Sequence, residues 1–257
     1  MPTLLPSVLA VFLHFFLAGC VTSTTGGFSD SASPEKALER RVELARNYIG
    51  EGNWRDAKRN LSLAAAIDPD NAEVHEAFAL VYQSTGEYEL AEENFKKAIS
   101  IQSGFSRARN NYAVFLFSQS RYEDAEVQLE YVVQDTLYTS RPQAYINLGL
   151  CRLQLFDPSG AEQAFVRALS MDNSNTIALL ETAMLRFDAE DYASATRYYN
   201  GYRKLVRQQS PRGLWLGVRL AKELGDQNAL SSYSMALGSL YPESAEYDAY
   251  KRSKIGE

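Results

Sequence analysis

The sequence predicts an all-α fold, a right-handed superhelical solenoid of about six helix hairpins. Alanine recurs along the chain in a fixed phase, with steps of 34, 34, 36, 34 and 34 residues. These alanines are Ala57, Ala91, Ala125, Ala161, Ala195 and Ala229. A large apolar residue follows each of them four positions later, at Leu61, Phe95, Leu129, Phe165, Tyr199 and Tyr233. A spacing of four places two side chains on one face of a helix, one turn apart.

The 34-residue period of paired helices is the signature of tetratricopeptide repeats. A large residue followed by a small one marks the first helix of a unit, because a neighbouring helix approaches closely at the small residue. These pairs are Leu44-Ala45, Phe78-Ala79, Tyr112-Ala113, Leu148-Gly149 and Leu216-Gly217. A single hairpin cannot bury its apolar face alone, so the hairpins are expected to stack and to form a concave surface.

Six units are expected within residues 37–243. Proline in Asp68-Pro69 ends the first unit, because proline cannot continue a helix. The approximate bounds are Leu38–Asn71, Ala72–Phe105, Ser106–Thr139, Pro142–Asn175, Thr176–Gln209 and Ser210–Glu243. The sixth unit is degenerate, since Gly225-Asp226 is displaced by about one residue from the usual turn. Residues 244–257 are predicted to form a C-terminal tail.

The N-terminal segment has the features of an export signal. Residues 4–18 are almost entirely apolar, a length that fits a secretory signal and is short for a bilayer span. Leu17-Ala18-Gly19-Cys20 resembles the bacterial lipobox, in which the cysteine is acylated and becomes the first residue of the mature protein. The sequence thus predicts a signal peptide at 1–19, lipidation of Cys20, and a flexible tether over 20–36. Ordinary signal cleavage beside an incidental cysteine is the alternative.

The chain shows no residue pattern typical of an enzyme, a cofactor site or a metal site. Cys20 and Cys151 give neither a disulfide framework nor a metal-binding pair. His14 falls in the predicted signal peptide, and His75 occupies a packing column between helices. Known catalytic and phosphate-binding motifs are absent from the sequence. The net charge of −6 does not indicate nucleic-acid binding. We therefore expect a non-enzymatic protein without a cofactor.

Residues on the first helix of each unit, one turn from the packing columns, are expected to face the concave groove. In the second unit they are mostly polar, with Glu73 and Glu76 among them, and in the third to fifth units they become apolar. The predicted partner groove consists of Val114, Phe117, Ile146, Leu150, Leu153, Ile177, Leu180, Met184 and Phe187. A contiguous apolar patch of this kind marks a partner site. Tighter curvature, with these residues packed on one another, is the alternative.

Several strings resemble the PilF/PilW family of outer-membrane lipoproteins of type IV pilus biogenesis. They are NNYAVFLFSQSRYEDA from Asn110, QDTLYTSRPQAYINLGL from Gln134, VRLAKELGD from Val218 and LYPESAEY from Leu240. The resemblance covers nearly the whole chain, including the lipobox and the six-unit layout. The role of Asp135 to Tyr138 within the second string stays open, and loop packing is one reading of it.

The resemblance implies a pilotin, a factor that helps secretin subunits reach the outer membrane and form their multimeric pore. It implies that Cys20 carries the lipid anchor on the periplasmic face and that the partners are secretin subunits, not nucleic acid. The periodicity alone does not exclude the alternative, a lipid-anchored repeat scaffold for cell-wall enzymes or for outer-membrane protein insertion.

Overall fold

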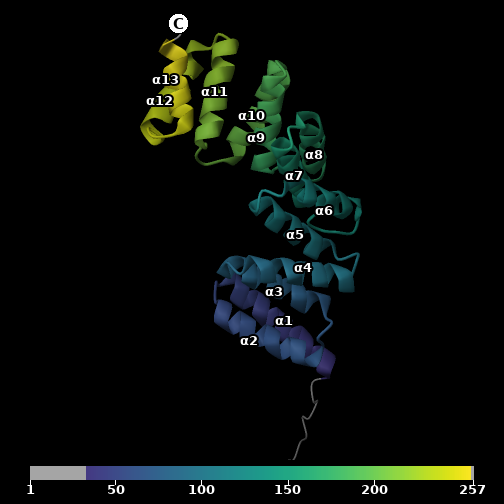
Figure 1. Cartoon of the computed structure of the whole chain (residues 1–257). Helices are drawn as coiled ribbons and strands as arrows, with labels where there is room; N and C mark the ends of the chain where they lie inside the picture. Colours follow the sequence, from purple (N-terminus) through teal and green to yellow (C-terminus); the bar gives the residue numbers. More distant parts are fainter. Residues whose placement is uncertain (1–32, 256–257) are drawn as a thin grey trace, which may run out of the picture.

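The computed structural model describes residues 33–255, which form thirteen α-helices and no strand. Figure 1 shows an elongated stack of helix pairs that runs from α1 and α2 at one end to α12 and α13 at the other. The helices are α1 (Pro34–Gly50), α2 (Trp54–Ile67), α3 (Ala72–Thr85), α4 (Tyr88–Ile101), α5 (Ser106–Ser118), α6 (Tyr122–Gln134), α7 (Arg141–Gln154), α8 (Pro158–Met171), α9 (Thr176–Asp188), α10 (Tyr192–Leu205), α11 (Pro211–Glu223), α12 (Gln227–Leu240) and α13 (Ala245–Ile255). In this part of the chain, no helix is both long and apolar enough to cross a membrane.

Each odd-numbered helix from α1 to α11 packs on the helix that follows it, so the predicted six hairpins and all-α fold class are confirmed. The helices of one hairpin are joined by a tight turn with one residue in the left-handed region. That residue is glycine in three turns, at Gly52, Gly86 and Gly225. Gly225 comes 35 residues after its counterpart Glu190, which matches the predicted displacement of one residue in the sixth unit.

The six alanines that recur in phase, here called the alanine column, lie along the core of the solenoid. Five of its six members are completely buried, and only Ala229 in the sixth hairpin is partly exposed. The large residue four positions later fills the space between neighbouring helices. Gly149 shows why small residues are needed opposite it: a Cβ there would lie 2.5 Å from Cε1 of Phe165. The periodic pattern therefore encodes close helix contacts as well as helix faces.

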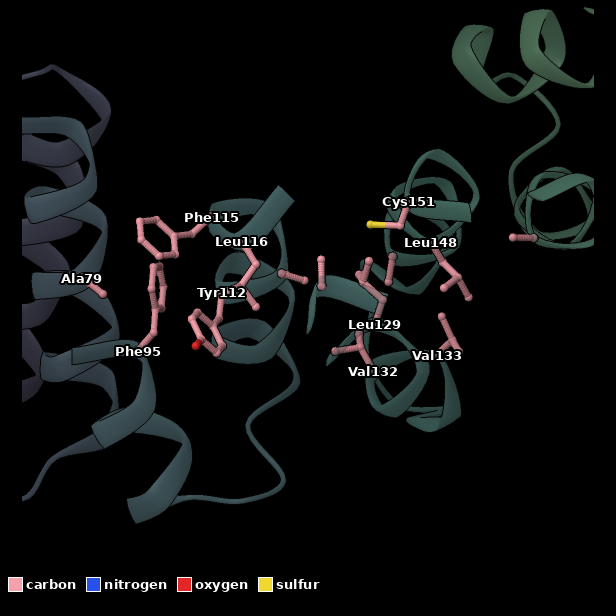
Figure 2. Packing of buried hydrophobic residues seen from close by; sticks show 14 of the residues in the cluster. Ala79, Phe95, Tyr112, Phe115, Leu116, Leu129, Val132, Val133, Leu148 and Cys151 are labelled. Atoms are coloured by element: carbon pink, nitrogen blue, oxygen red, sulfur yellow. The ribbon is translucent and has the colours of Figure 1, made fainter. Parts of the chain in front are cut away.

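The main core cluster, the largest of the core clusters, joins the second, third and fourth hairpins. Phe95 of α4 packs against two rings of α5, with centroid distances of 5.6 Å to Tyr112 and 5.8 Å to Phe115. Figure 2 shows these rings on one side of α5, with Leu129 and Cys151 on its other side. The cluster is continuous, so the middle hairpins share one hydrophobic core.

Both ends of the described chain are more helical than the sequence suggests. α1 begins at Pro34, inside the predicted tether of 20–36, because Ser33 accepts a hydrogen bond from the Lys36 amide and proline suits the first helical turn. The predicted C-terminal tail contains α13, whose Tyr247 and Tyr250 pack against Gly238 and Trp215. α13 therefore covers the last hairpin, as terminal helices do in repeat proteins. The predicted signal peptide 1–19 and Cys20 lie outside the described residues.

Candidate partner-binding groove

The nine predicted groove residues lie on α5, α7 and α9, the first helices of three consecutive hairpins. Two of them are buried, and the prediction for them is wrong. Ile146 is 1% exposed and packs against Phe165 and Ala178, while Leu180 is 7% exposed and packs in the next cluster along. Residues of α8 and α9 share a cluster with Ile146, and residues of α10 and α11 share one with Leu180, so the helices that follow in the chain enclose both side chains.

The other seven residues retain exposed surface. Val114 is 42% exposed and Ile177 is 46% exposed. The remaining five are half-buried: Phe117, Leu150, Leu153, Met184 and Phe187. The exposed apolar surface is therefore interrupted at the buried Ile146 and Leu180. Its central and C-terminal parts have different neighbouring side chains.

The central pocket lies between α5 and α7, and Leu129 of α6 also lines it. It has a volume of about 190 Å³ and is lined by Ala113, Val114, Phe117, Leu129, Asn147, Leu150 and Cys151. Asn147 is the one residue with a polar amide among these, and it also donates a hydrogen bond to Asn110 Oδ1 at 3.1 Å. Ala113, Leu129 and Cys151 belong to the main core cluster, so the floor of the pocket is rigid.

The C-terminal part of the predicted groove is covered by cations. The guanidinium of Arg212 lies 3.4 Å from the sulfur of Met184 and forms a bidentate ion pair with Glu181. The guanidinium of Arg219 stacks 4.4 Å from the ring centroid of Phe187. These side chains limit the access of an apolar ligand to Met184 and Phe187, and the central pocket is left as the better apolar site.

The N-terminal end of the concave surface is polar, as predicted, but Glu76 does not line it. Its carboxylate is fully buried, and it accepts hydrogen bonds of 2.6 Å from Arg46 Nη2 and from Asn111 Nδ2. Arg107 Nε lies 3.7 Å away. One carboxylate thus links α1, α3 and α5, and no sequence pattern distinguishes Glu76 from its exposed neighbour Glu73.

Comparison with known proteins decides the family. Residues 72–105 and 142–175 match the tetratricopeptide repeat family, with the bounds predicted for the second and fourth units. The type IV pilus assembly protein PilF of Pseudomonas aeruginosa is 36% identical to the chain over 249 residues, covering 96% of the chain and 98% of PilF. The chain belongs to the PilF/PilW family of type IV pilus biogenesis proteins.

Solved structures of two members of the PilF/PilW family share the fold. The structure of Pseudomonas aeruginosa PilF superposes with a TM-score of 0.82 at 36% identity, over 86% of this chain and 99% of that one. PilW, described as a widely conserved type IV pilus biogenesis factor, superposes with a TM-score of 0.71 at 25% identity, over 84% of this chain and 98% of that one. The resemblance read from the sequence is therefore confirmed at the level of family and fold.

The string from Asp135 to Tyr138, which resembles the PilF/PilW family, forms the loop between α6 and α7. Asp135 accepts hydrogen bonds from Ser106 Oγ at 2.5 Å and from the Leu137 amide at 3.0 Å, and the bond from Ser106 is the main reason that its pKa is lowered. Tyr138 is half-buried against the main core, and burial raises its pKa. Leu137 is 89% exposed. Asp135 and Tyr138 thus fix the loop, in agreement with the loop-packing reading.

Cys151 and His75 are the two residues of the described chain that the sequence analysis weighed as catalytic groups, and both have the surroundings of structural residues. Burial raises the pKa of Cys151 to about 12, so its sulfur remains a thiol at neutral pH. His75 is half-buried, with Nδ1 2.9 Å from Asn94 Oδ1 and Nε2 2.9 Å from the Pro69 carbonyl oxygen. Between residues 33 and 255, no group of three or more His, Cys, Asp or Glu side chains is placed to hold a metal ion.

Proposed function

We propose that this protein is a non-enzymatic outer-membrane lipoprotein that binds secretin subunits and promotes their localisation and multimerisation in type IV pilus assembly. Membership of the PilF/PilW family supports a role in pilus assembly. The lipobox-like sequence before Cys20 supports the lipid anchor. The structural observation that carries the binding role is the central pocket between α5 and α7.

The central pocket suits one large apolar side chain of a secretin segment. Its walls are apolar except for Asn147, and its volume of about 190 Å³ is below that of most small-ligand sites. The amide of Asn147 offers a hydrogen-bonding group beside the apolar floor. An amphipathic helix or an extended strand laid along the concave surface can insert such an anchor residue. While the pocket holds this anchor residue, the residue cannot contact other secretin subunits. Contact is delayed until the subunits meet at the membrane.

Acylation of Cys20 supplies the second half of the mechanism. A lipid anchor confines the repeats to the membrane surface and raises the local concentration of the bound secretin segment there. Lasting attachment requires at least two acyl chains, because a single chain gives only marginal binding. Binding and anchoring are separate properties in this account, and a variant can lose one and keep the other.

Cys20→Ala is therefore expected to leave secretin binding intact and to reduce assembled pore in the outer membrane by at least about fivefold, because the concentration gained by anchoring is lost. Membrane fractionation followed by quantification of the secretin multimer measures this. Thr25→Ala is the matched control, since it also truncates a side chain of the predicted tether but leaves the anchor cysteine unchanged. Normal pore abundance and location in Cys20→Ala cells would contradict the anchor role.

A further inference from the structure

A chain of three side-chain amides lies beside the central pocket. Nε2 of Gln143 donates a hydrogen bond to Oδ1 of Asn147 at 3.0 Å, and Nδ2 of Asn147 donates one to Oδ1 of Asn110 at 3.1 Å. Asn147 lines the pocket on α7, and Asn110 lies one turn before the pocket residue Val114 on α5. This chain, here called the amide relay, therefore connects the two helices at the edge of the pocket.

The two ends of the amide relay have unused hydrogen-bonding groups. Within residues 33–255, Nδ2 of Asn110 has no hydrogen-bond acceptor and Oε1 of Gln143 has no donor. Neither atom belongs to the enclosed polar atoms of this part of the chain, so a ligand can reach both. Rotation of all three amides by 180° exchanges the roles of the two ends, and one end still donates while the other accepts.

The burial of Asn110 distinguishes the amide relay from an ordinary polar surface. Its side chain belongs to a residue that is only 8% exposed, and an unused donor at such a position costs free energy. Asn60 is also 8% exposed, but its Nδ2 donates to the Asp56 carbonyl oxygen at 2.9 Å and its Oδ1 accepts from Arg41 at 3.0 Å. Asn60 is thus satisfied by the fold, whereas Asn110 has a donor left for a partner.

We infer that the amide relay binds the main chain of an extended segment whose apolar side chain occupies the central pocket. The free donor of Asn110 matches a peptide carbonyl group, and the free acceptor of Gln143 matches a peptide N–H group. The inference rests on the proposed secretin binding and names the conformation of the secretin segment. The pocket then selects the anchor side chain, while the relay holds the segment through groups that every residue has.

A bound helix does not match the amide relay. The main-chain N–H and C=O groups inside a helix are already paired with each other, so both relay ends would stay without a partner. An extended segment leaves its main-chain groups free on both edges, and each can reach an amide side chain. The relay therefore favours the extended strand of the two peptide forms that suit an apolar groove.

Fluorescence anisotropy of the full-length protein in detergent, with short labelled peptides that overlap along the secretin, tests the inference. The peptide whose binding Leu150→Glu abolishes identifies the segment. Asn110→Asp is expected to weaken this peptide at least about fivefold, because the carboxylate still accepts from Asn147 but has no N–H group to donate. Circular dichroism checks that the variant keeps its helices.

Changes in the peptide separate a main-chain contact from a structural role of Asn110. Each peptide bond near the anchor residue is replaced in turn by an ester, which removes the N–H group and weakens the carbonyl oxygen as an acceptor. We expect one such ester to weaken binding to the wild-type protein at least about fivefold. The same ester is expected to cost less than about twofold in Asn110→Asp, because the contact is already lost there.

Gln83→Glu is the matched control for the added charge. It introduces the same negative charge on α3, the first helix of the second hairpin, outside the relay and the pocket, and it is expected to change the affinity by less than about twofold. Binding that depends on Leu150 but is equal in wild type and Asn110→Asp overturns the inference alone, as does an ester loss that is the same in both proteins. Secretin peptides that do not bind, or that bind regardless of Leu150, overturn the proposed secretin site and the inference with it.

Discussion

Phe95→Ala is expected to lower the free energy of unfolding by about 4 kcal/mol, the largest effect of any single truncation considered for this protein. Phe95 is fully buried and packs against Tyr112 and Phe115 of the next hairpin. Its removal takes apolar surface out of the core and leaves a cavity that the surrounding rings cannot fill without moving off their rotamers. Because repeat proteins are stabilised by contacts between neighbouring units, loss of this interface also uncouples the second hairpin from the third.

Urea unfolding followed by far-ultraviolet circular dichroism measures the effect. Leu137→Ala is the control, since it also truncates a large apolar residue but the side chain is almost fully exposed. We expect it to change the free energy of unfolding by less than about 0.5 kcal/mol. A Phe95→Ala variant within about 1 kcal/mol of wild type would show that the main core cluster does not hold the middle hairpins together.

Glu76→Ala is expected to destabilise the protein by about 3 kcal/mol, because removal of the buried partner leaves Arg46 and Arg107 with only the half-exposed Glu73 as a counter-charge. Glu76 is fully buried, and its two carboxylate oxygens accept hydrogen bonds from Arg46 and Asn111. The side chains of Arg46 and Arg107 are both partly exposed, which places the effect near the lower end of the usual range. The loss is expected in the N-terminal half of the solenoid, where α1, α3 and α5 share this carboxylate.

Two variants distinguish the charge of Glu76 from its shape. Glu76→Gln keeps the volume and one acceptor, so we expect it to lose less stability than Glu76→Ala but more than an exposed control. Glu73→Ala is that control, since the Glu73 side chain is half exposed in its pair with Arg46 and is expected to cost less than about 1 kcal/mol. Thermal unfolding of the three variants in parallel measures the order. Equal stability of Glu76→Ala and Glu73→Ala would contradict the proposed role of the buried carboxylate.

Periodicity predicts the repeat fold well because it records close contacts that recur in every unit. Ala91 and Phe95 mark the second helix of a hairpin, and Gly149 marks the place where the Phe165 ring of α8 touches the backbone of α7 in the same hairpin. These contacts have the same geometry from one unit to the next. The residue type at one position of the repeat therefore indicates the same contact in every unit. The sixth unit departs from the columns, and there Ala229 and Tyr233 are only partly buried.

Features that depend on how far neighbouring units rotate are not encoded in the period. Ile146 and Leu180 share a register with groove residues, yet they are buried, Ile146 against residues of α8 and α9 and Leu180 against residues of α10 and α11. Glu76 has an exposed neighbour of the same type, and only the three-dimensional arrangement brings two arginines onto it. α13 has no repeat signal, because a terminal helix covers an apolar face without continuing the pattern.

The central claim is that an apolar anchor of a secretin subunit occupies the pocket between α5 and α7. Affinity capture of the full-length protein from solubilised envelopes, with the recovered secretin quantified, tests it directly. Leu150→Glu places a charge in the pocket, and we expect it to lower the recovery of secretin at least about tenfold. Val127→Glu, an equal change on the exposed surface of α6 outside the pocket, is expected to leave recovery unchanged. Full recovery of secretin by Leu150→Glu, or enrichment of a cell-wall synthase or an insertion-machine subunit in place of secretin, would contradict the account.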